Sequence, residues 1–193
     1  MMIDPKDCTK EDKELVASSL KDSQFFYCLM KRYEEKLINY VGHFTYLPTE
    51  DIADIVQESF IKAYQNLNDC DCNLKFSSWL YRIVHNQSVN FIKKHKLSLK
   101  ININENDDEF MAWLVADTNI EKETITKYFN EDIKTILEKL KPDYKEVLVL
   151  KFFEDKDYQE ISDILQKPMG TVATLLSRAK IQFKKIYEKT NKN

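Results

Sequence analysis

Apolar side chains recur every three or four residues in the first part of the chain, which is the spacing of a helix that buries one face. Between residues 10 and 45 they include Leu15, Tyr33 and Val41. The pattern is interrupted at residues 21–23, where Asp22 or Ser23 can cap a new helix. We therefore predict two helices in this segment, separated by a short break.

Two further amphipathic helices are expected before the pattern changes. Residues 51–67 place their apolar side chains on one stripe and their polar ones on the other side, with Thr49 as the expected N-cap. After a polar loop, residues 77–96 repeat the helical spacing and end in a basic run. Four helices that share an apolar interior make a first domain, residues 10–96.

The rest of the chain divides into a linker and a second helical domain. Residues 97–120 are rich in asparagine and acidic residues, which is a composition typical of linkers. The second domain covers residues 121–187. Its expected helices lie near 121–140, 143–153, 158–166 and 171–187. With only two glycines and four prolines among 193 residues, we predict an all-α fold of two small domains joined by an acidic linker.

The net charge of -3 averages over segments of opposite sign. Residues 81–100 carry five basic and no acidic side chains. Residues 105–123 carry seven acidic side chains and one basic, and residues 158–193 carry seven basic and three acidic. Two basic blocks therefore flank one acidic block, and the net charge argues against a uniformly cationic surface for nucleic acid.

The location of the protein is suggested by what the sequence lacks. The first residues are charged, and no segment approaches eighteen consecutive apolar residues, so we expect a cytoplasmic protein without membrane insertion. The four cysteines show no paired CxxC spacing, and in a reducing compartment we expect no disulfide. Cys70 and Cys72 either hold a metal or sense oxidants, or they are ordinary loop cysteines.

One short stretch raises the question of DNA binding. In YQEISDILQKPMGTVATLLSRAK, residues 158–180, two apolar-periodic runs flank the break 167–170. Proline ends the first helix, glycine suits a sharp turn, and Thr171 is the expected cap of the second helix. This is the pattern of a helix-turn-helix, whose second helix enters the major groove of DNA. A structural helical hairpin with a solvated basic face fits the same pattern.

Two longer segments resemble those of bacterial RNA polymerase sigma factors of the extracytoplasmic-function (ECF) class. ADIVQESFIKAY and FSSWLYRIVHNQSVNFIKKHK are similar to the promoter-melting region 2. LKPDYKEVLVLKFFEDKDYQEISDILQKPMGTVATLLSRAK is similar to the promoter-binding region 4. The resemblance implies a factor that binds core RNA polymerase, directs it to promoters and helps to open the DNA.

The resemblance also implies roles for residues of the first domain. Asp54, Gln57 and Glu58 would contact the β′ clamp helices of the polymerase, although on their own they read as a solvated helix face. A base extruded from the minus-10 element would enter a pocket formed by the loop at 68–75 and the start of the next helix. The implied minus-10 residues are Asn68, Asn73, Lys75, Phe76, Trp79, Arg82, Asn86, Asn90, Lys93 and Lys94. On its own, a tryptophan at the position of Trp79 is more often a core residue than a stacking platform.

The second domain would bind the β flap and the minus-35 element. The implied minus-35 residues are Thr171, Thr174, Ser177, Arg178 and Lys180. Family recognition helices often carry basic residues where this chain has Ala173 and Leu175, so we expect weaker DNA contact there. Sigma factors of this class are commonly held by an anti-sigma factor, which is therefore an expected partner.

Two other functions remain open at this stage, and a third is not expected. A sigma-like helical adaptor would bind a protein partner without melting DNA. A helix-turn-helix regulator would act without polymerase, although it would not need the block around Trp79. An enzyme is not expected, because the sequence has no Gly-rich phosphate loop and no HExxH motif, and neither a cofactor nor a metal is implied.

Overall fold

The computed structural model describes residues 8–45, 47–70, 74–98 and 131–190, and every regular element in these ranges is helical. The elements are α1 (Asp12–Ser19), η2 (Ser23–Phe25), α2 (Phe26–Thr45), α3 (Thr49–Gln65), η3 (Leu67–Asp69), α4 (Phe76–Ser98), α6 (Glu131–Glu138), α7 (Pro142–Phe152), α8 (Tyr158–Leu165) and α9 (Met169–Thr190). The predicted all-α class is confirmed. The predicted helix at 121–140 is observed from Glu131, and its earlier residues lie outside the described ranges.

The first group of helices, α1 to α4, packs around α2. The break that the sequence predicted is present, and the Asp22 side chain accepts a hydrogen bond from the Gln24 N–H at 3.0 Å. The prediction that Thr49 is the N-cap of α3 is wrong, because Thr49 is the first residue of that helix. Pro48 precedes it and lacks a side-chain donor or acceptor for capping. In α4 the helix continues to Ser98, two residues beyond the predicted end.

The second group, α6 to α9, contains the helix-turn-helix. Asp157 and Glu160 form a reciprocal capping box that fixes the start of α8. The turn forms at Gln166, which adopts the left-handed conformation with φ 52° and ends α8. Gly170 and Thr171 therefore do not have their expected roles. Both lie inside α9, whose first turn begins on the Pro168 carbonyl.

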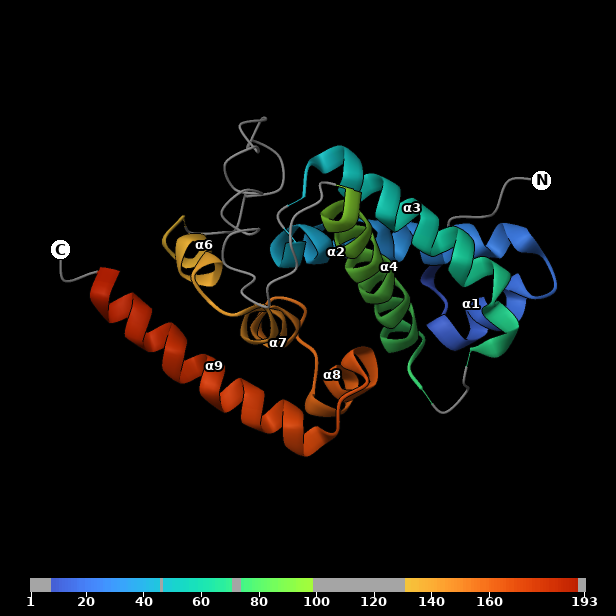
Figure 1. Cartoon of the computed structure of the whole chain (residues 1–193). Helices are drawn as coiled ribbons and strands as arrows, with labels where there is room; N and C mark the ends of the chain where they lie inside the picture. The colour runs from blue at the N-terminus through green and yellow to red at the C-terminus, as the bar shows by residue number, and fades with distance from the viewer. Residues whose placement is uncertain (1–7, 46, 71–73, 99–130, 191–193) are drawn as a thin grey trace.

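The two groups of helices are not separate bodies in this structure. The helices α8 and α7 pack against α4 and α2, and the buried apolar side chains of both groups join in one continuous core (Figure 1). In Figure 1, α4 runs through the centre, with α3 on one side of it and α8 at its lower end. The long helix α9 forms the outer edge of the molecule. The domain boundaries at 96 and 121 remain predictions.

The expectation of no disulfide is wrong for one pair. Cys8 and Cys28 are joined by a disulfide, with their Cα atoms 4.9 Å apart. The chain reverses at η2, and this reversal brings the segment before α1 against the first turn of α2. Arg32 holds that segment in place by donating to the Cys8 carbonyl oxygen at 2.8 Å and to Asp12 at 2.5 Å. Cys70 is half-buried as a free thiol, and Cys72 lies outside the described residues.

Candidate nucleic-acid and polymerase interface

The predicted polymerase contacts lie together on the exposed side of α3. Asp54, Gln57 and Glu58 are exposed, while the apolar stripe of the same helix is buried against α2 and α4. Sequence reasoning missed Ile61, which is 52% exposed one turn after Gln57 and Glu58. Its spacing from Asp54 and Glu58 carries the signal, since residues three and four apart share a helix face. The surface is therefore acidic with one apolar side chain, which suits a basic and partly apolar partner.

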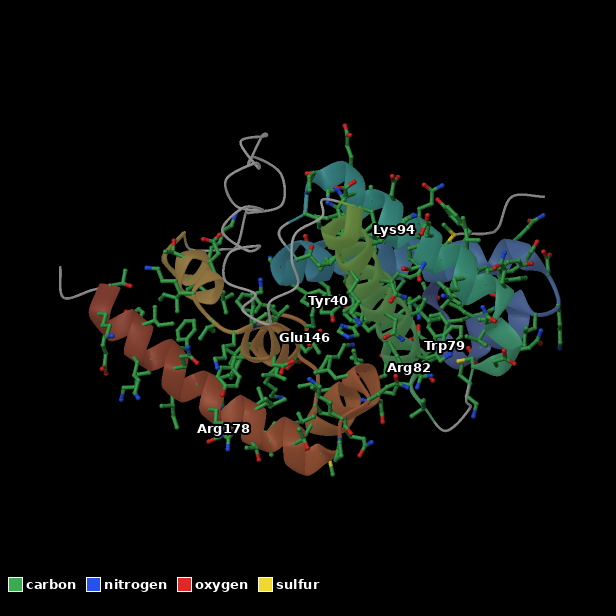
Figure 2. The ribbon with its side chains drawn as sticks, viewed as in Figure 1. Tyr40, Trp79, Arg82, Lys94, Glu146 and Arg178 are labelled. Atoms are coloured by element: carbon green, nitrogen blue, oxygen red, sulfur yellow. A yellow bond between two sulfur atoms is a disulfide. The ribbon has the colours of Figure 1, made fainter. Side chains whose placement is uncertain are left out.

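The predicted minus-10 residues of α4 form what we call the α4 stripe: Lys75, Trp79, Arg82, Asn86, Asn90, Lys93 and Lys94. Their spacing places them along one side of the helix. Asn86, Asn90, Lys93 and Lys94 are exposed, and Arg82 is half-buried. Figure 2 shows Lys94 at the end of α4 beside α3, and Arg82 at the opposite end, toward α8.

Phe76 and Trp79 are core residues in this structure. Both are buried, and their ring centroids lie 5.8 Å apart. The Phe76 ring also packs at 5.8 Å on Tyr33 of α2. Trp79 is thus not exposed as a stacking platform here. A role for it in holding a base would require its side chain to become accessible.

A cavity of about 680 Å³ lies beside the two described ends of the predicted minus-10 loop, at Cys70 and at residues 74–77. Lys75 and Phe76 of the predicted minus-10 set line it, together with Cys70. Its other wall comes from α1 and α2, and includes Asp12, Arg32 and Tyr33. No local pattern in the sequence predicts this second wall, because it is assembled from segments far from the loop. Asn68 is exposed nearby, and Asn73 lies outside the described residues.

The wall of this cavity is a charged and hydrogen-bonded cluster. Tyr33 donates to the Asp12 carboxylate, and Asp12 also pairs with Arg32 at 2.5 Å. Burial and the hydrogen bond to Asp12 raise the pKa of Tyr33 well above its ordinary value, so this hydroxyl remains a donor at neutral pH. The cavity therefore offers both polar edges and the Phe76 ring, a combination that can hold a nucleobase.

The predicted minus-35 residues form what we call the α9 stripe: Thr171, Thr174, Ser177 and Arg178. All four are exposed. In Figure 2, Arg178 lies on the outer side of α9, away from the first group of helices. The Thr174 hydroxyl donates to the Gly170 carbonyl oxygen at 2.8 Å, and its oxygen can still accept a hydrogen bond.

Two further positions of α9 differ from the expectation. Lys180 is exposed, but its Nζ lies 5.4 Å from the centroid of the Phe152 ring of α7, round the helix from Thr171 and Arg178. Leu175 is half-buried and packs against the core. A hydrophobic side chain at this position contributes to folding, so the absence of a basic residue there has a structural reason.

The two groups of helices meet through polar contacts as well as through the core. The Tyr81 hydroxyl of α4 donates to Glu154, just after α7, at 2.5 Å. His85 Nδ1 lies 2.6 Å from Glu146 Oε1 of α7. Lys75 Nζ lies 3.5 Å from Glu160 and 3.6 Å from Asp157 of α8. Figure 2 places Glu146 beside Tyr40 of α2, and the charge of Glu146 adds to burial in raising the pKa of Tyr40.

The described residues show neither a metal site nor a membrane-spanning helix beside these surfaces. Within that part of the chain, no group of three or more His, Cys, Asp or Glu side chains is arranged to hold a metal ion. None of the helices described is both long enough and apolar enough to cross a bilayer.

Comparison with known proteins assigns the two groups of helices to known families. Residues 29–97 match the family model of sigma-70 region 2, and residues 130–183 match that of sigma-70 region 4. The ECF RNA polymerase sigma factor SigW of Bacillus subtilis is 34% identical over 70% of this chain and 74% of its own. The ECF RNA polymerase sigma-E factor of Salmonella typhimurium is 30% identical over 82% of this chain and 84% of its own.

Solved structures agree on the fold. CnrH, in a complex with the cytosolic domain of CnrY, aligns with a TM-score of 0.65 at 21% identity, over 92% of this chain and 97% of its own. The sigma factor RpoE of Bartonella quintana, in a complex with the anti-sigma factor NepR, also gives 0.65, at 18% identity over 84% of this chain and 96% of its own.

These matches and the two helical surfaces define a transcription initiation factor of the sigma-70 kind. The chain belongs to the ECF class of RNA polymerase sigma factors. It binds core RNA polymerase and makes initiation specific for particular promoters.

Proposed function

We propose that the three surfaces described above divide the work of polymerase binding and promoter recognition. The exposed side of α3 binds the β′ clamp helices through Asp54, Gln57 and Glu58. The cavity beside Lys75 and Phe76 receives a base of the minus-10 element, and the α4 stripe follows the strand backbone. The α9 stripe reads the minus-35 element in the major groove, while the second group of helices contacts the β flap.

The observation that carries this proposal is the outward orientation of the α9 stripe within a helix-turn-helix. Thr171, Thr174 and Arg178 repeat at spacings of three and four, so they face one side of α9 along its first turns. The N-terminal turns of a recognition helix are the part that contacts base edges. Arg178 can donate two hydrogen bonds to guanine, and the threonine methyl groups can contact thymine.

We also make proposals about the location of the protein, its lack of catalytic activity and its partners. We place its action in the cytoplasm, where the polymerase works, and assign it no covalent chemistry of its own. An anti-sigma factor is a proposed partner, and the structural neighbours CnrH and RpoE were both solved bound to a partner chain. The absence of basic residues at Ala173 and Leu175 favours the helical adaptor, but the packing of Leu175 against the core accounts for one of these two positions, so that support is weaker.

Reversing one charge on α3 tests the polymerase surface. Glu58→Lys should weaken binding to core RNA polymerase about tenfold, because a cation then meets the proposed basic partner. Glu34→Lys, the same change on the exposed side of α2, is the matched control. Affinities measured by fluorescence anisotropy with Bacillus subtilis core polymerase would decide. Equal affinities for the Glu58 variant and the wild type would remove this surface from the proposal.

A further inference from the structure

The disulfide between Cys8 and Cys28 joins the segment before α1 to the first turn of α2. Disulfides inside a compartment that keeps thiols reduced are usually transient and redox-sensing. The segment that this one fixes leads directly into the wall of the cavity proposed for the minus-10 base. We propose that the pair Cys8–Cys28 is a redox-responsive clasp: when formed, it fixes that wall and favours binding of melted minus-10 DNA, and its reduction weakens this binding. The inference rests on the proposed function of the cavity and concerns its regulation.

One arginine connects the clasp to the cavity wall. Arg32 lies one turn after the disulfide in α2, and it donates to the carbonyl oxygens of Cys8 at 2.8 Å and Lys10 at 2.5 Å. The same guanidinium pairs with Asp12 at 2.5 Å, and Asp12 accepts a hydrogen bond from Tyr33. Arg32, Asp12 and Tyr33 all line the cavity. The position of the Cys8 backbone therefore helps to set where the polar groups of the wall lie.

The segment that carries Cys8 has little apolar packing of its own. Residues 8–14 are exposed or half-buried, and the first buried side chain is Leu15, in the first turns of α1. The N-cap of α1, Glu11, makes no capping hydrogen bond with its side chain. Without the disulfide, Arg32 remains as the main polar tie. Reduction should therefore loosen residues 8–14, while Leu15 keeps α1 packed on α2.

Both redox forms of the clasp are compatible with the fold. Cys28 is 1% exposed, and a reduced cysteine in a core behaves as a small apolar side chain. Breaking the bond therefore leaves no strongly polar group buried without a partner. Cys8 is half-buried and is the more accessible of the two residues. Because thiol–disulfide exchange depends on access, a reductant should attack the sulfur of Cys8.

Two electrons and two protons convert the clasp between its forms. In reduction, a thiolate of a dithiol such as dithiothreitol attacks Cys8 Sγ, the S–S bond breaks, and Cys28 leaves as a thiolate and takes up a proton. The second thiol of the reductant then displaces Cys8 from the mixed disulfide, and the reductant becomes a cyclic disulfide. In oxidation, a small disulfide such as oxidised glutathione accepts the two electrons and the two protons and becomes two thiols.

The first measurement asks whether the clasp forms and what it fixes. All comparisons use the full chain with Cys70→Ser and Cys72→Ser, so that only the clasp can respond to thiol reagents. Alkylation and mass spectrometry should find no reactive cysteine after oxidised glutathione and two after dithiothreitol. Reduction should lower the melting temperature by about 5–10 °C, because the bond closes a loop of about 20 residues. Amide hydrogens of residues 8–14 should exchange at least fivefold faster in the reduced form.

The second measurement asks whether the clasp controls DNA binding. Holoenzyme made with Bacillus subtilis core RNA polymerase is titrated with a fluorescent single-stranded oligonucleotide that covers the minus-10 region of a start site that depends on this protein. The oxidised form should bind at least threefold more tightly than the reduced form. Cys8→Ser should bind like the reduced form with either reagent. Binding of minus-35 duplex DNA is the control and should not change, because the α9 stripe lies on another part of the molecule.

Each failure has its own meaning. Cysteines that stay reactive, or that carry glutathione in place of the bond, would overturn the clasp. Equal exchange of residues 8–14 in both redox forms, or equal affinity of both forms for the oligonucleotide, would overturn it too and leave the promoter proposal intact. Absence of protein-dependent start sites, or of any minus-10 binding in either form, would overturn the proposed function of the cavity and with it this regulation.

Discussion

The two surfaces proposed to read DNA differ in how far the free protein exposes them. The α9 stripe is exposed along its length and points away from the rest of the molecule. The α4 stripe is exposed from Asn86 to Lys94, but Lys75, although exposed, is paired with α8, and Trp79 is buried. The α9 stripe, proposed to bind duplex DNA, is therefore accessible in the free protein. The α4 stripe, proposed to bind melted DNA, has residues that already contact other parts of the protein.

This difference has a physical basis. A recognition helix needs only backbone geometry and a few exposed side chains, because the major groove accepts a helix without deformation. A pocket for an unpaired base needs aromatic and apolar surface, and such surface is buried whenever the fold offers something to cover it. Here Phe76 and Trp79 pack on each other and on Tyr33.

The largest expected effect tests whether the two groups of helices share one core. Ile161→Ala in α8, where the side chain is fully buried, should lower the free energy of unfolding by about 2–5 kcal/mol. Because the core is continuous, the midpoint reported by Trp79 fluorescence in a Trp113→Phe background should fall with that of circular dichroism. A Trp79 midpoint that stays unchanged while the circular dichroism transition splits would show two independent bodies.

Removal of one arginine tests the exposed stripe. Arg178→Ala should weaken binding of the holoenzyme to minus-35 duplex DNA about tenfold or more, because a bidentate contact to guanine contributes roughly 1–3 kcal/mol. Lys189→Ala near the end of α9 is the control for a general loss of positive charge. Competition binding on a promoter fragment measures both. Equal affinities for wild type and the Arg178 variant would exclude this residue from the site.

A buried lysine gives a prediction for pH. Burial lowers the pKa of Lys145 from 10.5 to about 7, although Glu138 and Glu146 oppose the shift. Between these two values the unfolded chain binds more protons than the folded one, so stability should rise with pH. The gain between about pH 7 and pH 8.5 is at most about 2 kcal/mol. Lys145→Met should stabilise the protein near pH 7 and flatten this rise in thermal unfolding; an unchanged slope would contradict the assignment.

The smallest effect concerns Lys75, the exposed residue of the α4 stripe that is paired with α8. Lys75→Gln should lower the affinity of the holoenzyme for a single-stranded minus-10 oligonucleotide and reduce the slope of log affinity against log salt by about 0.7, the value for one phosphate contact. Lys62→Gln, on the exposed side of α3, is the control. An unaltered salt slope would mean that Lys75 pairs with α8 but does not contact the DNA.

The sequence predicted the helices and most of the exposed site residues, because these depend on local spacing. Helical periodicity identified α2 to α4 and α7 to α9 within a few residues, and it placed Arg178 on an outer face. Helical periodicity did not predict which residue makes the turn between α8 and α9. The left-handed conformation lies at Gln166 and not at the glycine, since the helix end and the turn are set by the packing of α8 against α9.

What local patterns could not reveal are the contacts between distant segments. The second wall of the cavity, the Cys8–Cys28 disulfide and the pairing of Tyr81 with Glu154 each join parts of the chain separated by twenty or more positions. Charge and periodicity describe such residues as solvated or as core, and only the folded chain brings them together. Lys75 illustrates the point: its charge was evident, but its carboxylate partners were not.

Run-off transcription tests the central claim most directly. Core RNA polymerase would transcribe a library of genomic fragments with and without this protein, and the 5′ ends of the transcripts would be mapped. We predict discrete start sites that depend on the protein and share sequence elements near minus 10 and minus 35. Stable binding to polymerase without any new start site would contradict the account and would favour a helical adaptor instead.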